Sequence, residues 1–236
     1  HPRITEELLL NTVELVTAVH TRVSDAVDDL QGQLAEVRAI TDPLDVELMC
    51  AGTHPFAQWF DQQITDKERY HKLIDRTQWW GRQMLIWGVH VHVGISSAHK
   101  VMPIITSLLN QYPHLLALSC SSPFWEGERT GLMSFRLMIF NGVPRTGLPE
   151  QFSSWGEYRR HTDILAETGV IADTSRIWWD LRPSLRYPTL ETRVMDCCTT
   201  LEDALSLAAL NQCLIRMLYR LRRANQRWRM YSHLLL

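Results

Sequence analysis

The amino-acid sequence predicts an α+β fold. Segments in which apolar residues recur every three or four positions follow one another along the chain with short segments in which apolar and polar residues alternate. No internal repeat or low-complexity linker separates these segments, so we expect a single domain over residues 1–236. Of the 236 residues, 45% are hydrophobic and 21% are charged, which is ordinary for a globular protein with a sizeable core.

The first third of the chain is expected to contain helices and two possible strands. Residues 5–34 are predicted to be largely helical from the spacing of their leucines and valines, although the β-branched stretch 12–17 equally fits a strand. Residues 46–51 alternate like a short strand that ends at the turn-prone segment 52–55. A helix is then predicted to begin at 66–69.

The remaining elements follow a central strand at residues 90–94. Helices are predicted at residues 102–118, 155–165 and 201–221, and strands at residues 177–182 and 190–196. Pro113 is expected to kink or break the first of these helices, because proline lacks the backbone donor that a helix interior needs. Residues 119–149 hold Ser, Gly and Pro around one apolar run and are expected to form loops at an active site.

The central strand carries two histidines, His90 and His92, inside an apolar run. In a strand both imidazoles point to one face while valines pack behind them. A polar pair in such a place needs partners, because an unpaired buried polar group costs about 1–3 kcal/mol. The partners can be a metal, a phosphate, carboxylates or the backbone, and two hydrogen-bonded histidines on a half-wet sheet face are an equal alternative.

Two later strands each carry an acid and an arginine at a spacing of two, which places both on one face. These pairs are Asp180 with Arg182 and Glu191 with Arg193. Carboxylates and imidazoles on such a face suit Mg²⁺, and arginine forks suit the phosphates of a nucleotide. Ordinary cross-strand salt bridges give the same pattern. A further alternative is a Zn²⁺ or Fe²⁺ enzyme that uses His90, His92 and Glu191 as ligands.

Composition excludes several classes of function. The net charge of −2 gives no field that would attract nucleic acid or an acidic membrane surface, and no apolar run is long enough to span a bilayer. The sequence contains no motif typical of a glycine-rich phosphate-binding loop, a dinucleotide-binding fold, a hydrolase nucleophile elbow or a zincin metalloprotease helix. We therefore expect no nucleic-acid or membrane partners. The five cysteines show no C-x-x-C spacing and lie mostly in apolar surroundings, so they are expected to be reduced core thiols in a cytoplasmic protein. The chain opens at His1 without a Met, so upstream residues and some loops are expected to be missing.

Seven short motifs occur in one order along the chain. They are Thr-Val-Glu-Leu-Val-Thr at 12–17, Ala-Gly-Thr-His-Pro-Phe at 51–56, Glu-Arg-Tyr at 68–70, Gly-Val-His-Val-His-Val-Gly at 88–94, Ser-Ser-Pro-Phe at 121–124, Trp-Asp-Leu-Arg-Pro-Ser at 179–184 and Thr-Leu-Glu-Thr-Arg-Val-Met-Asp at 189–196. Together they resemble the glutamate–cysteine ligase type 2 family of ATP-dependent carboxylate–amine ligases. The resemblance runs from about residue 1 to about residue 213.

The resemblance implies a glutamine synthetase/guanido kinase-like catalytic fold, in which a curved, mainly antiparallel sheet carries the active site and helices cover its other face. It also implies a reaction of glutathione-type biosynthesis. ATP phosphorylates the γ-carboxylate of L-glutamate, and the amine of L-cysteine or another amine displaces phosphate to give the amide, ADP and phosphate. Mg²⁺ neutralises charge on the migrating phosphoryl group in such transfers. Activity with cysteine itself can be weak in this family.

The resemblance also implies roles for individual residues. Glu14, His90 and Glu191 look like metal ligands, and Glu191 with Arg193 looks like the catalytic pair. Nucleotide-binding roles fall to Arg193, His92 and Arg182, and the binding of the amino-acid substrates falls to Arg136, Arg69 and Tyr70.

Two departures from the family pattern qualify these implications. The family opens with a Gly-x-Glu-x-Glu strand that is not present before His1, and this N-terminal strand is expected to exist upstream. Arg129 stands where the family more usually has an acid. A homologue that keeps the fold without catalysis is therefore the last alternative. Nine tryptophans supply surface suited to an interface, so a homodimer is expected.

Overall fold

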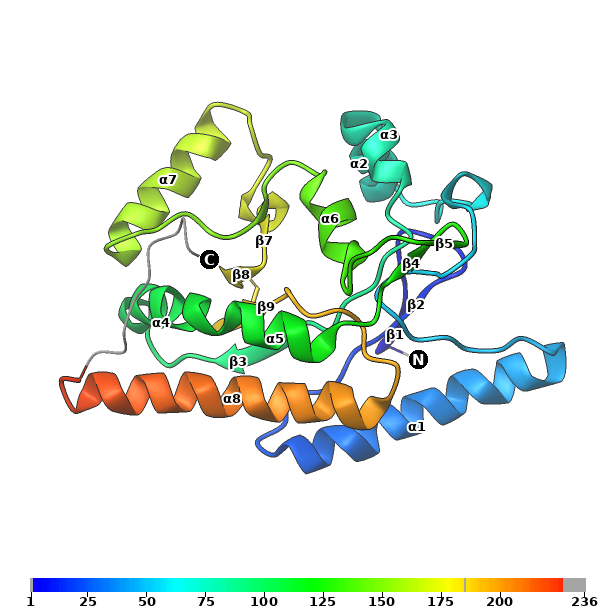
Figure 1. Cartoon of the computed structure of the whole chain (residues 1–236). Helices are drawn as coiled ribbons and strands as arrows, with labels where there is room; N and C mark the ends of the chain where they lie inside the picture. Colours follow the sequence, from blue (N-terminus) through cyan, green and yellow to red (C-terminus); the bar gives the residue numbers. More distant parts are fainter. Residues whose placement is uncertain (1, 185, 227–236) are drawn as a thin grey trace. The chain divides into compact units, whose positions relative to one another are not determined.

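The computed structural model describes residues 2–184 and 186–226 and consists of helices and strands, as the sequence predicts (Figure 1). The chain divides into two compact units, which are described separately. The first unit comprises His1–Trp87, Ser119–Val143 and Asp196–Ala208, and the second comprises Gly88–Leu118, Pro144–Met195 and Ala209–Leu236. The division passes through the long C-terminal helix α8 (Leu201–Arg223).

The first unit combines short antiparallel hairpins with helices. Strand β1 (Ile4–Glu6) pairs with β2 (Val13–Leu15), and β4 (Phe124–Trp125) pairs with β5 (Glu128–Arg129). The helices are α1 (Val23–Thr41), α2 (Glu68–Thr77), α3 (Trp79–Arg82) and α6 (Phe135–Asn141), with 3₁₀ turns at η1 (Asp42–Leu44) and η2 (Trp59–Asp61).

The structure corrects two predictions in this unit. The strand interpretation holds for the β-branched stretch near residue 14, where Thr5 and Glu14 are register partners, and the predicted helix begins only at Val23. The predicted strand 46–51 is not formed, since its residues are mostly exposed and no described segment pairs with them. Because no strand lies beside this segment, its backbone N–H and C=O groups form hydrogen bonds with water instead of a β-ladder.

A cluster of apolar side chains forms the core of the first unit. Its buried members are Leu8, Leu9, Tyr70, Leu85, Trp125 and Ile139, contributed by segments that are far apart in the sequence. Each fully buried side chain of this size stabilises the fold by about 1.5–3 kcal/mol relative to exposure. The cluster therefore fixes α2 and α6 against the segment that follows β1.

The second unit is built on a three-stranded antiparallel sheet in the order β3 (Val91–Gly94), β9 (Thr189–Thr192), β8 (Leu181–Pro183) (Figure 1). Strand β6 (Thr146–Gly147) pairs in parallel with β7 (Trp178–Trp179). The helical elements are η3 (Ala98–Lys100), α4 (Val101–Leu108), η4 (Leu109–Gln111), α5 (Tyr112–Ser119), α7 (Trp155–Glu167), η5 (Thr174–Arg176) and the second part of α8.

Three predicted elements of this unit are interrupted or shorter than expected. The helix predicted at 102–118 is divided by η4 just before Pro113. The strand predicted at 177–182 changes partners at Asp180, whose amide donates to the carbonyl of Gly147 at 2.8 Å before β8 joins β9. The strand predicted at 190–196 is only β9, because the chain leaves the sheet after Thr192.

The core of the second unit lies between the sheet and α4. Leu108, Leu181 and Leu190 are each 0% exposed, and α4 packs on β8. Asn211 of α8 is also buried, 3.3 Å from the hydroxyl of Thr192. In residues 2–184 and 186–226 no helix has the length and apolar character required to cross a membrane.

Candidate functional site

The central feature of the second unit is a row of three polar side chains across its sheet. Strand β9 places Glu191 directly opposite His92 of β3 on one side and Arg182 of β8 on the other. Register partners in an antiparallel sheet project their side chains to the same face. The strand therefore brings together three residues whose roles the sequence predicts, although two of them are almost a hundred positions apart in the chain.

Both carboxylate oxygens of Glu191 accept hydrogen bonds from guanidinium groups. Arg182 Nε donates to Glu191 Oε2 at 2.7 Å, and Arg193 Nη1 donates to Oε1 at 2.5 Å. Glu191 is only 3% exposed. Charge-assisted hydrogen bonds of this kind are roughly twice as strong as neutral ones, so the two arginines are held in fixed positions by one buried anion.

The pKa of Glu191 depends on two opposing effects, burial and nearby positive charge. Burial alone would raise the pKa of its carboxyl, but the positive charges of Arg193 and Arg182 outweigh burial and lower the pKa to about 2. The carboxylate therefore remains charged at neutral pH. Burial lowers the pKa of the Arg193 guanidinium, and the charge of Glu191 opposes that effect.

The two histidines occupy different positions beside this ion-paired group. His90 precedes β3, and its Nδ1 lies 3.4 Å from Arg193 Nη1. His92 Nδ1 lies 2.9 Å from the hydroxyl of Thr189, while its Nε2 is 4.0 Å from Glu191 Oε1. Burial lowers the pKa of His92, so the imidazole is neutral at pH 7. Both imidazoles therefore lie beside the ion pair of Glu191 and Arg193, although only His92 belongs to β3.

The backbone of Arg193 is fixed by a buried partner. Its amide donates to the carbonyl oxygen of Asp180 at 2.7 Å, and the hydroxyl of Tyr112 donates to the same oxygen at 2.8 Å. Tyr112 is buried, which raises the pKa of its phenol well above the ordinary value. The main-chain carbonyl of Asp180 therefore holds the backbone of Arg193 in place.

Two guanidiniums and two acids meet at this site, because the charge of Asp180 acts on Arg193 together with that of Glu191. The guanidinium forks of Arg182 and Arg193, with neutral His92 beside them, suit a phosphate or carboxylate ligand. Among the described residues, no three His, Cys, Asp or Glu side chains gather into a group that could hold a metal. His90, His92 and Glu191 therefore do not form the transition-metal site considered as an alternative above.

Three other predicted residues lie together in the first unit. Arg69 donates a hydrogen bond to the hydroxyl of Tyr70, and its guanidinium lies 4.4 Å from the centre of that ring. Burial raises the pKa of Tyr70, the charge of Glu7 raises it further, and Glu14 adds to this effect. Glu14 itself is exposed on β2 and accepts a hydrogen bond from Thr5 at 3.3 Å. The metal-ligand role expected for Glu14 stays a prediction.

Arg136, the fourth predicted residue of this unit, lies in α6 beside a buried acid that has no predicted role. Its Nη1 is 3.9 Å from Oδ1 of Asp196, and both side chains are buried. Asp196 accepts hydrogen bonds from the hydroxyls of Ser122 at 2.6 Å and Ser134 at 2.8 Å, and from the amide of Ser121 at 3.1 Å. This acid organises the segment that holds Arg136.

The sequence contains a signal for this network. Asp196 ends one of the seven motifs and Ser121 with Ser122 opens another, but a linear pattern does not show that the two motifs meet. Gly52, from a third motif, packs closely against Asp196. A Cβ atom on Gly52 would lie 2.7 Å from Asp196 Cγ, closer than real side chains approach. Three motifs therefore converge on one buried carboxylate.

A cavity of about 250 Å³ opens next to this network in the first unit. It is lined by Met49, Cys50, Ala51, Thr53, Pro55, Ser121, Pro123, Phe124 and Thr199. Most of these side chains are apolar, and the hydroxyls of Thr53, Ser121 and Thr199 supply polar groups. The volume is sufficient for a small organic molecule.

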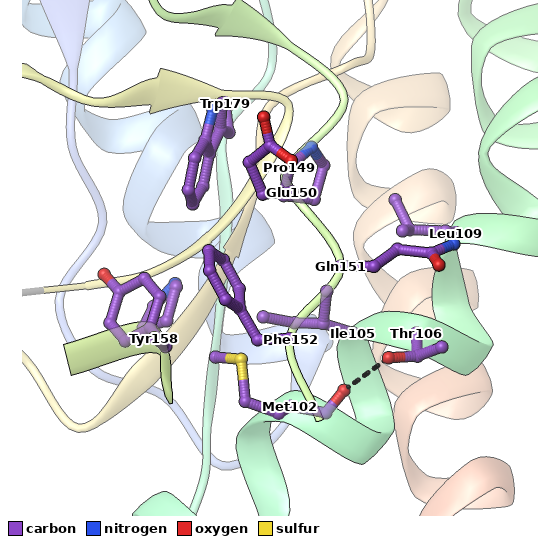
Figure 2. Close-up of a pocket in the computed structure, with 11 residues that line it drawn as sticks. Met102, Ile105, Thr106, Leu109, Pro149, Glu150, Gln151, Phe152, Tyr158 and Trp179 are labelled. Atoms are coloured by element: carbon purple, nitrogen blue, oxygen red, sulfur yellow. Dashed lines mark hydrogen bonds between the residues drawn. The ribbon is translucent and has the colours of Figure 1, made fainter. Parts of the chain in front are cut away.

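The second unit contains a much smaller cavity between α4 and the segment before α7 (Figure 2). Figure 2 shows Phe152, Tyr158, Trp179 and Met102 around it, and the rings of Phe152 and Trp179 lie 5.9 Å apart. Its volume of about 10 Å³ is at the lower limit for one water molecule. This is a packing defect in an aromatic cluster and has no room for a substrate.

Comparison with known proteins identifies the family. The family described as "Glutamate-cysteine ligase family 2 (GCS2)" matches residues 2–235. A protein of Leifsonia xyli subsp. xyli named "Putative glutamate--cysteine ligase 2" is 54% identical over 214 residues, which cover 91% of this chain and 57% of that protein. A protein of Mycobacterium sp. strain KMS named "Putative glutamate--cysteine ligase 2-1" is 56% identical with the same coverage.

A third relative gives the same result. The "Putative glutamate--cysteine ligase 2-2" of Rhodococcus jostii is 55% identical over 91% of this chain and 57% of its own length. The chain thus spans somewhat more than half the length of the relatives it matches. The match covers every described residue, including both arginines that bind Glu191, and the chain belongs to glutamate–cysteine ligase family 2.

Proposed function

We propose that the protein is an ATP-dependent carboxylate–amine ligase that joins the γ-carboxylate of L-glutamate to an amine, with L-cysteine as the first candidate. Membership of the family supports the class of reaction. The observation that carries the proposal is the buried carboxylate of Glu191, which holds Arg182 and Arg193 on one sheet face. A fixed pair of guanidiniums is one arrangement that can stabilise the charge of a transferred phosphoryl group.

In this proposal Arg193, Arg182 and His92 bind the phosphates of ATP. The guanidiniums are already oriented by Glu191, so they stabilise charge on the transferred phosphoryl group without first reorganising. Neutral His92, fixed by Thr189, is available to donate one hydrogen bond to a phosphate oxygen. Glu191 and Arg193 are the proposed catalytic pair, with Glu191 acting by holding Arg193 in place.

Mg²⁺ requires ligands beyond this row of side chains. One carboxylate whose oxygens are both bound by guanidiniums does not by itself fit an ion that prefers several oxygen ligands. A Mg²⁺ ion would enter with ATP and neutralise charge on its phosphates, and the metal-ligand roles expected for Glu14, His90 and Glu191 stay predictions.

The reaction itself has two steps. A γ-carboxylate oxygen of glutamate attacks the γ-phosphorus of ATP, and ADP leaves to give γ-glutamyl phosphate. The amine nitrogen then attacks the γ-carbonyl carbon, loses a proton, and inorganic phosphate leaves. Arg136, Arg69 and Tyr70 are the proposed amino-acid binders, because guanidinium forks bind carboxylates through two hydrogen bonds.

We further propose that the protein has the glutamine synthetase/guanido kinase-like catalytic fold in a single domain. We propose that it is a cytoplasmic homodimer that binds neither nucleic acid nor membranes. A non-catalytic homologue is the competing interpretation. The Arg182–Glu191–Arg193 group favours the enzyme, because a buried carboxylate holds two guanidiniums that remain partly exposed and so can reach a ligand.

The full-length protein tests this proposal directly. We expect ADP release that requires both glutamate and an amine, and a γ-glutamyl product of the same amount detected by mass spectrometry. Arg193→Gln is expected to lower kcat by about 100-fold, the usual effect of removing one group that stabilises transition-state charge. The matched control Arg160→Gln changes an exposed arginine of α7 and should leave kcat unchanged. Full turnover in Arg193→Gln would contradict the proposed role.

A further inference from the structure

An aromatic ring lies beside the proposed phosphate site of the second unit. Tyr187 comes just before β9, and the centre of its ring is 6.2 Å from the centre of the His92 ring, with an angle of 86° between the two planes. His92 stands at one end of the row that continues through Glu191 to Arg182. Tyr187 therefore adjoins this row at the end formed by His92.

Much of the Tyr187 side chain remains open to solvent. The residue is 48% exposed, whereas Tyr70, Tyr112 and Tyr158 are buried. Apolar ring surface that is left in water gains free energy when a second flat ring covers it. Tyr187 thus offers a ligand a stacking surface that the buried tyrosines do not offer.

A positive charge accompanies this ring. The guanidinium carbon of Arg186 lies 5.5 Å from the centre of the Tyr187 ring, within the range of a cation–π interaction. Arg186 is itself exposed. The two neighbouring side chains combine a flat apolar surface with a cation, and this combination is typical of sites that bind a base attached to phosphate.

The backbone around Tyr187 is already hydrogen-bonded. The amide of Tyr187 donates to the hydroxyl of Ser184 at 3.3 Å, and its carbonyl accepts from the amide of Thr189 at 2.7 Å. The carbonyl of Pro188 accepts from the amide of Ile95 at 2.8 Å. These backbone groups are engaged within the protein, so a ligand at this position would contact the side-chain ring.

The aromatic cluster shown in Figure 2 does not offer the same contact. Tyr158 and Trp179 are 6% and 7% exposed, and the cavity among these rings has a volume of about 10 Å³. Rings that already cover one another must separate before a ligand can stack on them. The exposed ring of Tyr187 needs no such rearrangement.

We infer that the base of the bound nucleotide stacks on Tyr187, with the guanidinium of Arg186 beside it. The inference rests on the proposed function, because it takes Arg182, Arg193 and His92 as the binders of the phosphate chain. The ribose links this chain to the base, so the base of a bound nucleotide lies close to the phosphate site. Tyr187 supplies an exposed ring at that place, in contact with one of the proposed phosphate binders.

Binding measurements separate the base from the phosphates. Calorimetry on the full-length protein with Mg²⁺ compares ATP with inorganic tripolyphosphate, which has a chain of three phosphates but no ribose or base. In Tyr187→Ala we expect the Kd for ATP to rise about tenfold, the usual size of one lost base–aromatic stack, and the Kd for tripolyphosphate to change less than about twofold. Tyr187→Phe keeps the ring and should bind ATP like the wild type. The control Phe60→Ala removes a ring of the first unit that is 63% exposed and should leave both constants unchanged.

The two ligands also distinguish failure of this inference from failure of the proposed function. A wild type that binds neither ligand would overturn the proposed phosphate site and the inference with it. A wild type that binds tripolyphosphate as tightly as ATP would leave the phosphate site in place and overturn the stacking role. Equal weakening of both ligands in Tyr187→Ala would also overturn it, because the ring would then act only as a support for His92.

A second test needs only the wild type and therefore does not depend on the folding of a variant. 8-Azido-ATP carries its photoreactive group on the base. After irradiation with Mg²⁺ and digestion with trypsin, we expect the label on the peptide of residues 187–193, detected by mass spectrometry, and excess ATP should prevent labelling. Labelling confined to other peptides would contradict the placement of the base at Tyr187.

Discussion

At the scale of single residues, Glu191 determines the properties of the proposed phosphate site. A carboxylate that is 3% exposed remains ionised because two guanidiniums bind it, and it holds both of them in turn, while Arg182 also donates to the carbonyl of Ile177. Removing one partner from such a group leaves uncompensated buried charge and typically costs about 3–5 kcal/mol. The residue therefore links the stability of the sheet to the chemistry proposed for it.

This link predicts how stability depends on pH. The folded-state pKa of Glu191 is lowered from 4.5 to about 2, so its contribution is present above pH 4.5 and is lost as the pH falls toward 2. The shift corresponds to about 3 kcal/mol. Urea unfolding of wild type and Glu191→Gln should show a difference in unfolding free energy that shrinks by about this amount between pH 6 and pH 2. A constant difference would show that the two arginines do not act on Glu191.

A second prediction at this scale concerns Gly52. In Gly52→Ala the new methyl group would lie 2.7 Å from Asp196 Cγ and 2.9 Å from Ser122 Cβ, so we expect a loss of about 1–3 kcal/mol in unfolding free energy. The control Gly32→Ala is in the exposed interior of α1 with no atom within 4 Å, and should stabilise the protein by about 0.5–1 kcal/mol. Equal effects of the two substitutions would contradict the close packing around Asp196.

At the scale of elements, the long periodic segments could be predicted and the pairing of strands could not. The helices at 155–165 and 201–221 follow from a repeated apolar spacing that is purely local. The row His92, Glu191 and Arg182 depends on the register between three strands, which is set by contacts between residues far apart in the chain. Sequence spacing therefore placed Glu191 and Arg193 on one face but did not indicate that Arg182 binds the same carboxylate.

The candidate site in the first unit shows the same limit. Arg69 and Tyr70 are adjacent in the sequence, and the structure places them in contact. Asp196 received no role, because its partners Ser122 and Ser134 come from a segment that periodicity assigns only to loops. A buried acid in a short strand motif is a recognisable signal only when its hydroxyl partners are also known.

The start of α7 gives a prediction about one element. Ser154 is the N-cap, its hydroxyl accepts from the amide of Glu157 at 3.2 Å, and the Glu157 carboxylate accepts from the amide of Ser153 at 2.7 Å. Ser154→Ala should lower the unfolding free energy by about 1 kcal/mol, as measured by thermal or urea unfolding. Glu167→Ala, at the exposed other end of α7, should change it by less than about 0.5 kcal/mol. Similar losses in both variants would contradict the capping role.

At the scale of the whole molecule, family membership and local geometry support one account. The chain spans 57% of the length of its relatives, and within that span it contains a fixed pair of guanidiniums in one compact unit and the proposed amino-acid binders in the other. The account therefore assigns phosphate binding to the β8–β9 face and substrate carboxylate binding to Arg136, Arg69 and Tyr70. Its central claim is that glutamate is activated as an acyl phosphate.

Oxygen-isotope transfer measures that claim most directly. The full-length protein is supplied with ATP, Mg²⁺, L-cysteine and L-glutamate labelled with ¹⁸O in both γ-carboxylate oxygens, and the released phosphate is analysed by mass spectrometry. Our account predicts that each phosphate carries one ¹⁸O atom, because the bridging oxygen of γ-glutamyl phosphate leaves with phosphorus when the amine attacks carbon. Release of unlabelled phosphate alongside amide formation would contradict it.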